Sequence, residues 1–565
     1  MNWRIISVLL AALCLGGLLA GDRSSATEET SLARFAPSGA LLYFEAKDFS
    51  SLLAQWNSSE QKVDWLRSDN YAVFSKSRLF LRLKEAGDQF ATTAGIPPDM
   101  KLASQAAGGE SAVAIYDIGK LEFLYVTRLG VGHGEPALLA EARSKFETRS
   151  AAGQPFYIRK DPQSGREVAF STSGEYLLLA TREDLLAQSL ELLAGGKAPA
   201  IDNESWWTDS VAAAGHEGDL RLVLNLEKIV PSPYFRTYWI QRNITDTNTY
   251  RAAISDLSLS SGEYREERVL LKKDATATTN ASANAAAADL ARLVPADAGA
   301  YQIAASPTTE ASLALLETKL LAPHPGPGVA SQIAPQVQLS SGETGGGGDL
   351  ETRIDQAPLE VRPQTSPGEP LRALLTQNPV QASLKVQSTD LDRDKVFVRV
   401  HTAVVLSGTS EWNEAEVRSA VTDFVRPALT ASGLGTTWQN KPGHFELDGL
   451  WTLAAAVRGK YLFVSDDPAL LDRLTSATKA SSPAARAVFI AGFNHAAERE
   501  RFVRLVNLLD GHAAGSSSTP GQSPEFFSGN IAGLSGVLAK LSSEKIMVRD
   551  AGSKVMQTVT YEWEK

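Results

Sequence analysis

The chain has 565 residues and a formal net charge of −10, from 65 acidic and 55 basic residues. An acidic chain with no block of lysine or arginine lacks the basic footprint that nucleic acid and anionic lipid require, so we expect neither as a partner. The single cysteine, Cys14, lies in an apolar N-terminal run, so the mature chain is expected to hold no disulfide and no thiolate metal site.

The first 26 residues have the pattern of an export signal. A charged start at Met1–Arg4 precedes an apolar run at Ile5–Ala20, and the small residues Ser24–Ala26 follow. We expect a signal peptide at 1–26 that is cleaved after its last residue, which places the protein in the periplasm or cell envelope, or outside the cell. The run is short for a membrane span, which needs roughly 20 apolar residues. Retention of the segment as an N-terminal anchor is the alternative, and it is the one membrane contact that we expect.

A pattern near the start of the chain recurs in its middle, which predicts an internal duplication. The matched residues, at equal spacing, are Leu32, Ala33, Arg34, Pro37 and Tyr43 in the first copy and Leu290, Ala291, Arg292, Pro295 and Tyr301 in the second. Such repeats indicate two related domains, at 27–273 and 289–565, joined by a linker at 274–288 that lacks large apolar side chains. The second domain is predicted to contain a Gly/Pro-rich insertion at 322–370 and a flexible loop at 512–524.

Each half is predicted to run in the order strand, helices, hairpin, helix, three strands, helix, strand and closing hairpin. The predicted hairpins pair 112–116 with 122–127, 254–259 with 264–272, 383–387 with 395–406, and 545–549 with 554–563. Because hairpins join antiparallel strands, we expect an α+β fold in which each domain is a mainly antiparallel sheet with helices packed on one face.

Two helices carry recognisable boundary signals. Thr181 and Asp184 predict a capping box for the first helix, and Gly195 with its neighbouring glycine predicts its end. Asp467 followed by Pro468 predicts the start of the corresponding helix in the second half.

The second copy of the opening pattern resembles a known family. The matching residues are similar to the leucine-proline-alanine-aspartate strand that follows the signal peptide in a family of exported bacterial proteins of unknown function; they are Leu290, Val294, Pro295, Ala296, Asp297 and Tyr301. The first copy departs from that pattern, with serine and glycine in place of alanine and aspartate. The resemblance implies a location in the bacterial envelope and brings no catalytic residue.

Catalytic and metal-binding motifs are incomplete throughout. No two histidines stand at the spacing of a zinc protease, and the aspartates at 390, 392 and 394 begin a calcium loop that lacks its glycine and its final glutamate. The acid pairs Glu266-Glu267 and Asp466-Asp467 are interpreted as solvated strand edges and helix starts. We therefore expect no catalytic residue, no metal and no cofactor.

An aromatic cluster in the first half is the one candidate site, and the second half has no equivalent. Its residues are Trp206, Trp207, Tyr234, Phe235, Arg236, Tyr238 and Trp239. Aromatic side chains with arginine are typical of protein interfaces and of sugar-stacking surfaces. The alternative is a core helix that packs on the sheet.

These observations favour a non-enzymatic exported envelope protein that binds or scaffolds, with an envelope protein or a glycan as the partner. Two alternatives remain open. A glycan or peptidoglycan hydrolase needs an inward-facing pair of carboxylates, or a histidine with a carboxylate, in one cleft. A carrier of an apolar ligand or lipid needs a sizeable apolar cavity.

Overall fold

The computed structural model describes residues 31–67, 71, 74–76, 78–129, 135–233, 247–260, 262–274, 280–321, 368–391, 398–431, 437–448, 452–476, 487–499, 501 and 541–563. The predicted signal peptide, the loop at 512–524 and most of the insertion at 322–370 lie outside them. The chain divides into two compact units. Unit 1 comprises Met1–Thr279, Arg393–Val398 and Ala491–Lys565, and unit 2 comprises Asn280–Asp392 and Arg399–Ile490.

Unit 1 alternates helices with strands, as the hydrophobic pattern predicts. Its elements in the first half are η1 (Leu32–Phe35), β1 (Leu42–Ala46), α2 (Phe49–Ser58), α3 (Glu60–Arg67), α5 (Arg78–Ala94), α6 (Met100–Ala106), β2 (Ser111–Asp117), β3 (Glu122–Arg128), α7 (Ala137–Ala142), η2 (Arg143–Lys145), β4 (Glu147–Ala151), β5 (Gln154–Lys160), β6 (Glu167–Ser173), β7 (Tyr176–Ala180), α8 (Glu183–Leu193), η3 (Ile201–Asn203), α9 (Ser205–Ala213), β8 (Leu220–Asn225), α10 (Leu226–Ile229), β9 (Tyr250–Ser260) and β10 (Glu263–Lys272). From the end of the chain it also takes β19 (Leu541–Asp550) and β20 (Lys554–Trp563).

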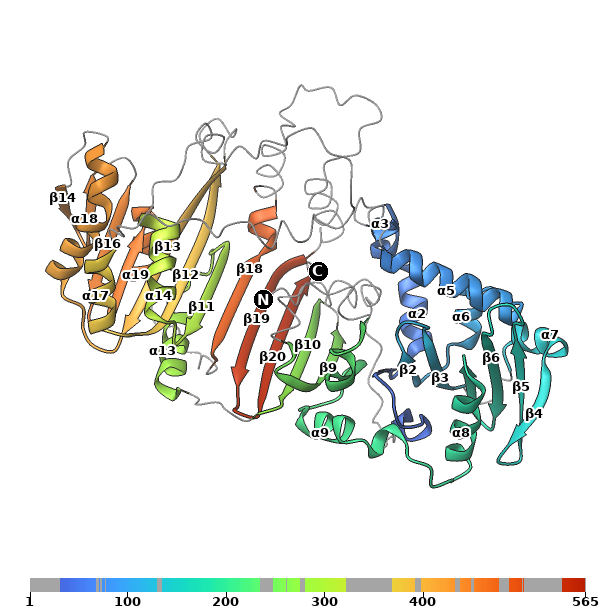
Figure 1. Ribbon diagram of the computed structural model, residues 1–565. Helices are drawn as coiled ribbons and strands as arrows, with labels where there is room; N and C mark the ends of the chain where they lie inside the picture. The colour runs from blue at the N-terminus through green and yellow to red at the C-terminus, as the bar shows by residue number, and fades with distance from the viewer. Residues whose placement is uncertain are drawn as a thin grey trace, which may run out of the picture. The chain divides into compact units, whose positions relative to one another are not determined.

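The strands of unit 1 pair antiparallel in every described pairing. Neighbouring strands follow the order β4, β5, β6, β7, β3, β2, β1, β8, β9, β10, β20, β19. The hairpin β19–β20 lies against β10 (Figure 1), with Tyr264 opposite Tyr561. The second domain therefore does not run to residue 565 as the sequence predicted, because β20 pairs with β10 and β19 with β20, which places this hairpin in unit 1.

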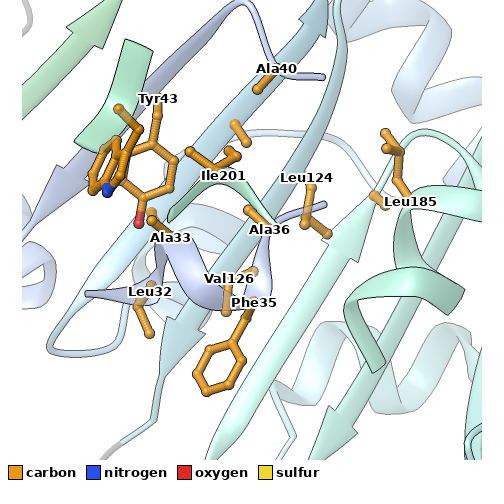
Figure 2. Close-up of a cluster of buried hydrophobic side chains, with 14 of the residues drawn as sticks. Leu32, Ala33, Phe35, Ala36, Ala40, Tyr43, Leu124, Val126, Leu185 and Ile201 are labelled. Carbon is orange, nitrogen blue, oxygen red and sulfur yellow. The ribbon is translucent and has the colours of Figure 1, made fainter. Parts of the chain in front are cut away.

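Helices cover both faces of this sheet, which corrects the prediction of one covered face. On one face, Leu32 and Phe35 pack with Leu124 and Val126 of β3 and with Leu185 of α8 (Figure 2). On the other face, residues of α6 and α7 pack against alternate residues of β6 and β7. All five residues of β7 are buried, so the uninterrupted apolar run Tyr176–Ala180 follows from burial on both sides.

Unit 2 is built from the same kinds of element. It contains α13 (Ala281–Ala291), β11 (Ala300–Ala305), α14 (Thr309–Leu316), η4 (Glu317–Leu321), α17 (Glu369–Gln377), β12 (Val380–Leu391), β13 (Val398–Gly408), α18 (Glu414–Ala431), β14 (Thr437–Lys441), β15 (His444–Asp448), β16 (Leu453–Arg458), β17 (Tyr461–Ser465) and α19 (Pro468–Ser476), and β18 (Phe489–Asn494) begins at its end. Strands β14, β15, β16, β17 and β13 pair antiparallel in that order, and β11 pairs with β12. Adjacent residues Val404 and Val405 point to opposite faces, and both are fully buried, so this sheet is also covered on both sides.

The predicted order of elements is close to the observed one in both halves. The first half runs through β1, helices, β2–β3, α7, β4–β7, α8, β8 and β9–β10, and the second through β11, helices, β12–β13, α18, β14–β17, α19, β18 and β19–β20. Each half has four strands where three were predicted between the last two helices, because β4 and β14 are short and polar edge strands. The mixed α+β character with antiparallel pairing is confirmed.

Part of the predicted linker is a helix. The unit boundary at Thr279 falls within 274–288, but α13 begins at Ala281, with Asn280 accepting a hydrogen bond from the Ala283 N–H at 3.2 Å. Ala283 and Ala287 are fully buried. Alanine is the strongest helix former, and its small side chain allows close packing, so a stretch without large apolar residues still forms a buried helix.

The sequence predicted the start of α19 and the end of α8 correctly, but not the start of α8. Asp467 accepts from the N–H groups of Ala469 and Leu470, as predicted for the start of α19. The capping box at Thr181 is wrong, because α8 begins two residues later and the Thr181 hydroxyl instead accepts from the Phe123 N–H on β3. Gly195 has a positive φ just past the end of α8, as a C-terminal glycine should.

Candidate functional site

The two tryptophans of the predicted aromatic site belong to the core. Trp206 and Trp207 lie on α9 and are only 6% and 5% exposed. Trp207 packs edge-on against Tyr43 of β1, with ring centroids 4.7 Å apart. Because α9 packs on the sheet through these rings, the core alternative is the correct one for this pair. Tyr234, Phe235, Arg236, Tyr238 and Trp239 lie outside the described residues.

A buried carboxylate, Glu45 on β1, ties the opening segment to the sheet. It accepts hydrogen bonds from the Ser31 hydroxyl at 2.9 Å, the Leu32 N–H at 2.9 Å and the Tyr43 hydroxyl at 3.1 Å. Burial raises the pKa of Glu45 above its ordinary value, and it also raises the pKa of Tyr43. All these contacts are internal to the fold, so the group acts as a structural anchor for the repeated opening pattern.

Beside it, Arg221 of β8 and Asp256 of β9 form a buried ion pair. They stand opposite each other in the sheet, with Nε to Oδ1 at 2.8 Å and Nη2 to Oδ2 at 3.2 Å. Burial lowers the pKa of Arg221, but the hydrogen bonds and the charge of Asp256 outweigh it, so the net direction is upward. Sequence inspection singled out neither member of this pair.

Both carboxylates of the acid pair on β10, Glu266 and Glu267, form ion pairs with neighbouring arginines. Glu266 accepts from the Ser255 hydroxyl at 2.6 Å and pairs with Arg268, and all three lie within the sheet. Glu267 pairs with Arg265 at 2.6 Å. The interpretation of Glu266 as a solvated edge residue is wrong, because β10 lies between β9 and β20 and the side chain is buried.

The acid pair before α19 has structural roles as well. Asp466 accepts from the Thr402 N–H at 2.8 Å, and Asp467 caps the helix. The interpretation of Asp467 as a helix start is therefore correct.

Each histidine in the described part of the chain has a carboxylate neighbour. The pairs are His216 with Glu267 at 3.1 Å, His401 with Asp390 at 3.5 Å, His444 with Glu446 at 2.9 Å and His495 with Glu544 at 3.7 Å. Among the described residues no group of three or more metal-binding side chains is positioned to hold an ion.

The strongest candidate surface is a helical segment that sequence inspection missed, which we call the helical arm (residues 49–92, α2, α3 and most of α5). None of its described side chains is buried. The elements at the same place in the second half, α14 and α17, bury Leu313, Leu316, Leu371 and Leu375. The arm thus exposes apolar side chains where its counterpart contributes to a core.

The arm carries most of the exposed large apolar side chains that the structure describes. Six large hydrophobic side chains are exposed in the described part of the chain, and four of them are Val63 (43%) and Leu66 (46%) of α3 with Leu81 (54%) and Leu83 (47%) of α5. On α5, Leu83 lies on the same face as Phe90, whereas Leu81 lies on the opposite side of the helix. The sequence signal was present in α5, where Leu83, Ala86 and Phe90 recur at helical spacing beside arginine and lysine.

No helix among the residues that the structure describes is long and apolar enough to cross a membrane. No protein-family model and no curated protein matches the chain. Three solved structures of the protein TP0453, in crystal forms I, IV and III, have 11–12% sequence identity and a TM-score of 0.23. They cover 43–45% of this chain and 80–84% of their own. Similarity at this level supports no conclusion about this chain.

Proposed function

We propose that the protein is a non-enzymatic binding or scaffolding module of the bacterial envelope, which makes its contacts through the helical arm. The observation that carries this proposal is the absence of any buried side chain among the described residues 49–92. An apolar surface that the chain does not cover itself gains free energy when a partner covers it, at about 25 cal/mol per Å² of apolar area. This surface replaces the aromatic cluster as the contact site, since Trp206 and Trp207 are in the core.

We also infer that the two halves arose by duplication. The support is the shared element order, together with equivalent pairings: β1 pairs with β2 as β11 pairs with β12, and β3 pairs with β7 as β13 pairs with β17. The repeated leucine also keeps its environment, since Leu32 and Leu290 are both fully buried ahead of the first strand. The helical arm of the first half has no buried side chain among its described residues, whereas its counterpart in the second half does. This difference between the copies supports the proposal that the arm is used for binding.

Export rests on the sequence of residues 1–26 and on the resemblance of the opening pattern to exported bacterial proteins. The proposed location is the periplasm or cell envelope. The proposed partner is another component of that envelope.

The proposal is tested by photo-crosslinking in the source cells. A benzophenone amino acid replaces Leu83, which is 47% exposed on α5, in one variant of the full chain and Val400, which is 43% exposed on β13, in a matched control. We expect protein or lipid adducts at position 83 and none above background at position 400. Equal adduct yields at the two positions would show that the arm is not a contact surface.

A further inference from the structure

We propose that unit 2 contains a pH-sensitive contact, the histidine clamp (His444 with Glu446 and Asp472). The clamp holds helix α19 to strand β15 when the imidazole ring is protonated, and it loosens when the ring loses its proton. This inference is independent of the proposed function, because the helical arm belongs to unit 1 and the clamp to unit 2.

The imidazole ring of His444 lies between two carboxylates that come from different elements. Its Nε2 atom is 2.9 Å from Oε1 of Glu446, two residues further along β15. Its Nδ1 atom is 3.2 Å from Oδ1 of Asp472, which lies in α19. The ring therefore joins a strand of the sheet to a helix that packs on the neighbouring strands β16 and β17.

The ring is almost completely removed from solvent. The His444 side chain is 7% exposed, whereas those of Glu446 and Asp472 are 25% and 58% exposed. Among the described residues the buried Nδ1 atom has no aligned hydrogen-bond partner, although Oδ1 of Asp472 is within reach. Buried polar atoms without such a partner are uncommon in folded proteins, so this nitrogen needs an explanation.

The two protonation states of the ring fit this arrangement differently. A neutral imidazole carries one N–H, so one nitrogen donates to a carboxylate while the other points a lone pair at the second carboxylate, which is repulsive. An imidazolium carries two N–H groups and can donate to both carboxylates through charge-assisted hydrogen bonds. The folded arrangement therefore favours the protonated ring.

Two cations on neighbouring strands also face this site. Lys441 of β14 stands opposite His444 in the sheet, and its Nζ atom is 3.9 Å from Oε2 of Glu446. Arg458 of β16 donates to the backbone carbonyl of the glycine before His444 at 3.1 Å. Both cations have oxygen partners, whereas the two carboxylates lie against the ring nitrogens, so we expect the carboxylates to decide the charge of the ring.

Apart from this contact, α19 is held to the sheet by its apolar face. Leu470, Leu471 and Leu474 are at most 1% exposed. The other charged side chains of the helix have partners elsewhere, since Asp467 caps its start and Arg473 pairs with an aspartate outside it at 2.7 Å. The clamp therefore adds to an existing contact, and its loss is expected to loosen α19 without unfolding unit 2.

The direction of the response follows from the charge change. Histidine is the side chain whose charge ordinarily changes between about pH 5 and about pH 8. Because the folded site favours the protonated ring, the contribution of the clamp is present below this range and is lost as pH rises through it. Asp472 is more than half exposed, so solvent screens the pair, and we expect the opening of α19 to change by about fivefold.

The test is hydrogen–deuterium exchange of α19 in the full chain. Exchange is followed by mass spectrometry at about pH 5.5 and about pH 8, and it is corrected for the intrinsic dependence of exchange on pH. The variants are H444Q, which removes the titrating ring, and D472N, which removes the carboxylate on the helix. The matched control is H401Q, because His401 on β13 of the same unit also lies beside a carboxylate, that of Asp390, at 3.5 Å.

In the wild type and in H401Q we expect α19 to be protected about fivefold more strongly at the lower pH. In H444Q the protection should be the same at both pH values, and in D472N most of the difference should be lost. D472N decides the result if H444Q fails to fold, as judged by circular dichroism, because Asp472 is exposed and its replacement leaves the core intact.

A wild type with no difference between the two pH values overturns the proposal. So does a difference of equal size in wild type and H444Q, which would leave His444 with a structural role alone. If D472N keeps the whole difference, the ring does not hold α19 and the clamp is wrong. If H401Q also loses the difference, the response belongs to unit 2 as a whole and not to His444.

Discussion

Trp207 distinguishes the core from the surface interpretation of the aromatic cluster. Its side chain is 5% exposed and packs edge-on against Tyr43, which is fully buried. Truncation of a buried tryptophan to alanine costs about 3–5 kcal/mol, from lost burial and the cavity left behind. The aromatic pair adds about 0.5–1.5 kcal/mol of its own. We therefore expect Trp207→Ala to lower the stability of unit 1 by about 4 kcal/mol.

Urea unfolding followed by far-ultraviolet circular dichroism measures this loss without relying on tryptophan fluorescence. The matched control is Leu81→Ala, which removes a side chain that is 54% exposed and should change stability by less than about 1 kcal/mol. Trp207→Phe should retain most of the stability, because it keeps an aromatic ring against Tyr43. If Trp207→Ala unfolds at the same urea concentration as the wild type but loses a partner, the core assignment is refuted.

Three further predictions concern unit 1, each measured by urea unfolding. Burial raises the folded-state pKa of Glu45 above its ordinary 4.5, so its contribution is fully present below that pH and is lost as pH rises toward the folded-state pKa. The stability of Glu45→Gln relative to wild type should therefore increase with pH above 4.5, and a decrease would contradict the direction of the shift. Asp256→Ala should cost about 3–5 kcal/mol, because it removes two hydrogen bonds from the buried Arg221 guanidinium and leaves it only the His216 carbonyl and the more distant Glu217 carboxylate. Replacing both Arg221 and Asp256 with leucine or methionine should recover most of the loss; equal losses in single and double variants would exclude this cause. Gly108→Ala places its new methyl against the backbone carbonyl at the end of β3 and should destabilise by about 1–3 kcal/mol, whereas Gly109→Ala meets no atom within 4 Å; equal effects of the two substitutions would contradict the clash.

Local signals in the sequence predicted much of the secondary structure. The β9–β10 and β19–β20 hairpins are found where alternation predicted them, and Asp467 with Pro468 begins α19. These features are set by backbone hydrogen bonds within a few residues, and the side chains that favour them lie in the same short window.

Burial could not be predicted in this way. Trp206 and Trp207 have the composition of a binding surface and lie in the core, whereas Leu83 belongs to the apolar face of a helix and lies exposed. Whether an apolar face is covered depends on which distant elements pack against it, and the local pattern is the same in either case.

By itself the sequence determined the class of fold, the order of its elements and the signal-like start of the chain, because each depends on residues close together along it. Only the tertiary structure decided that β20 pairs with β10, that α13 is a buried helix and not a linker, and that no described side chain of the helical arm is buried. Those outcomes depend on contacts between residues far apart in the chain. Many strand edges and apolar faces could form such contacts, and the local sequence does not specify which of them pair.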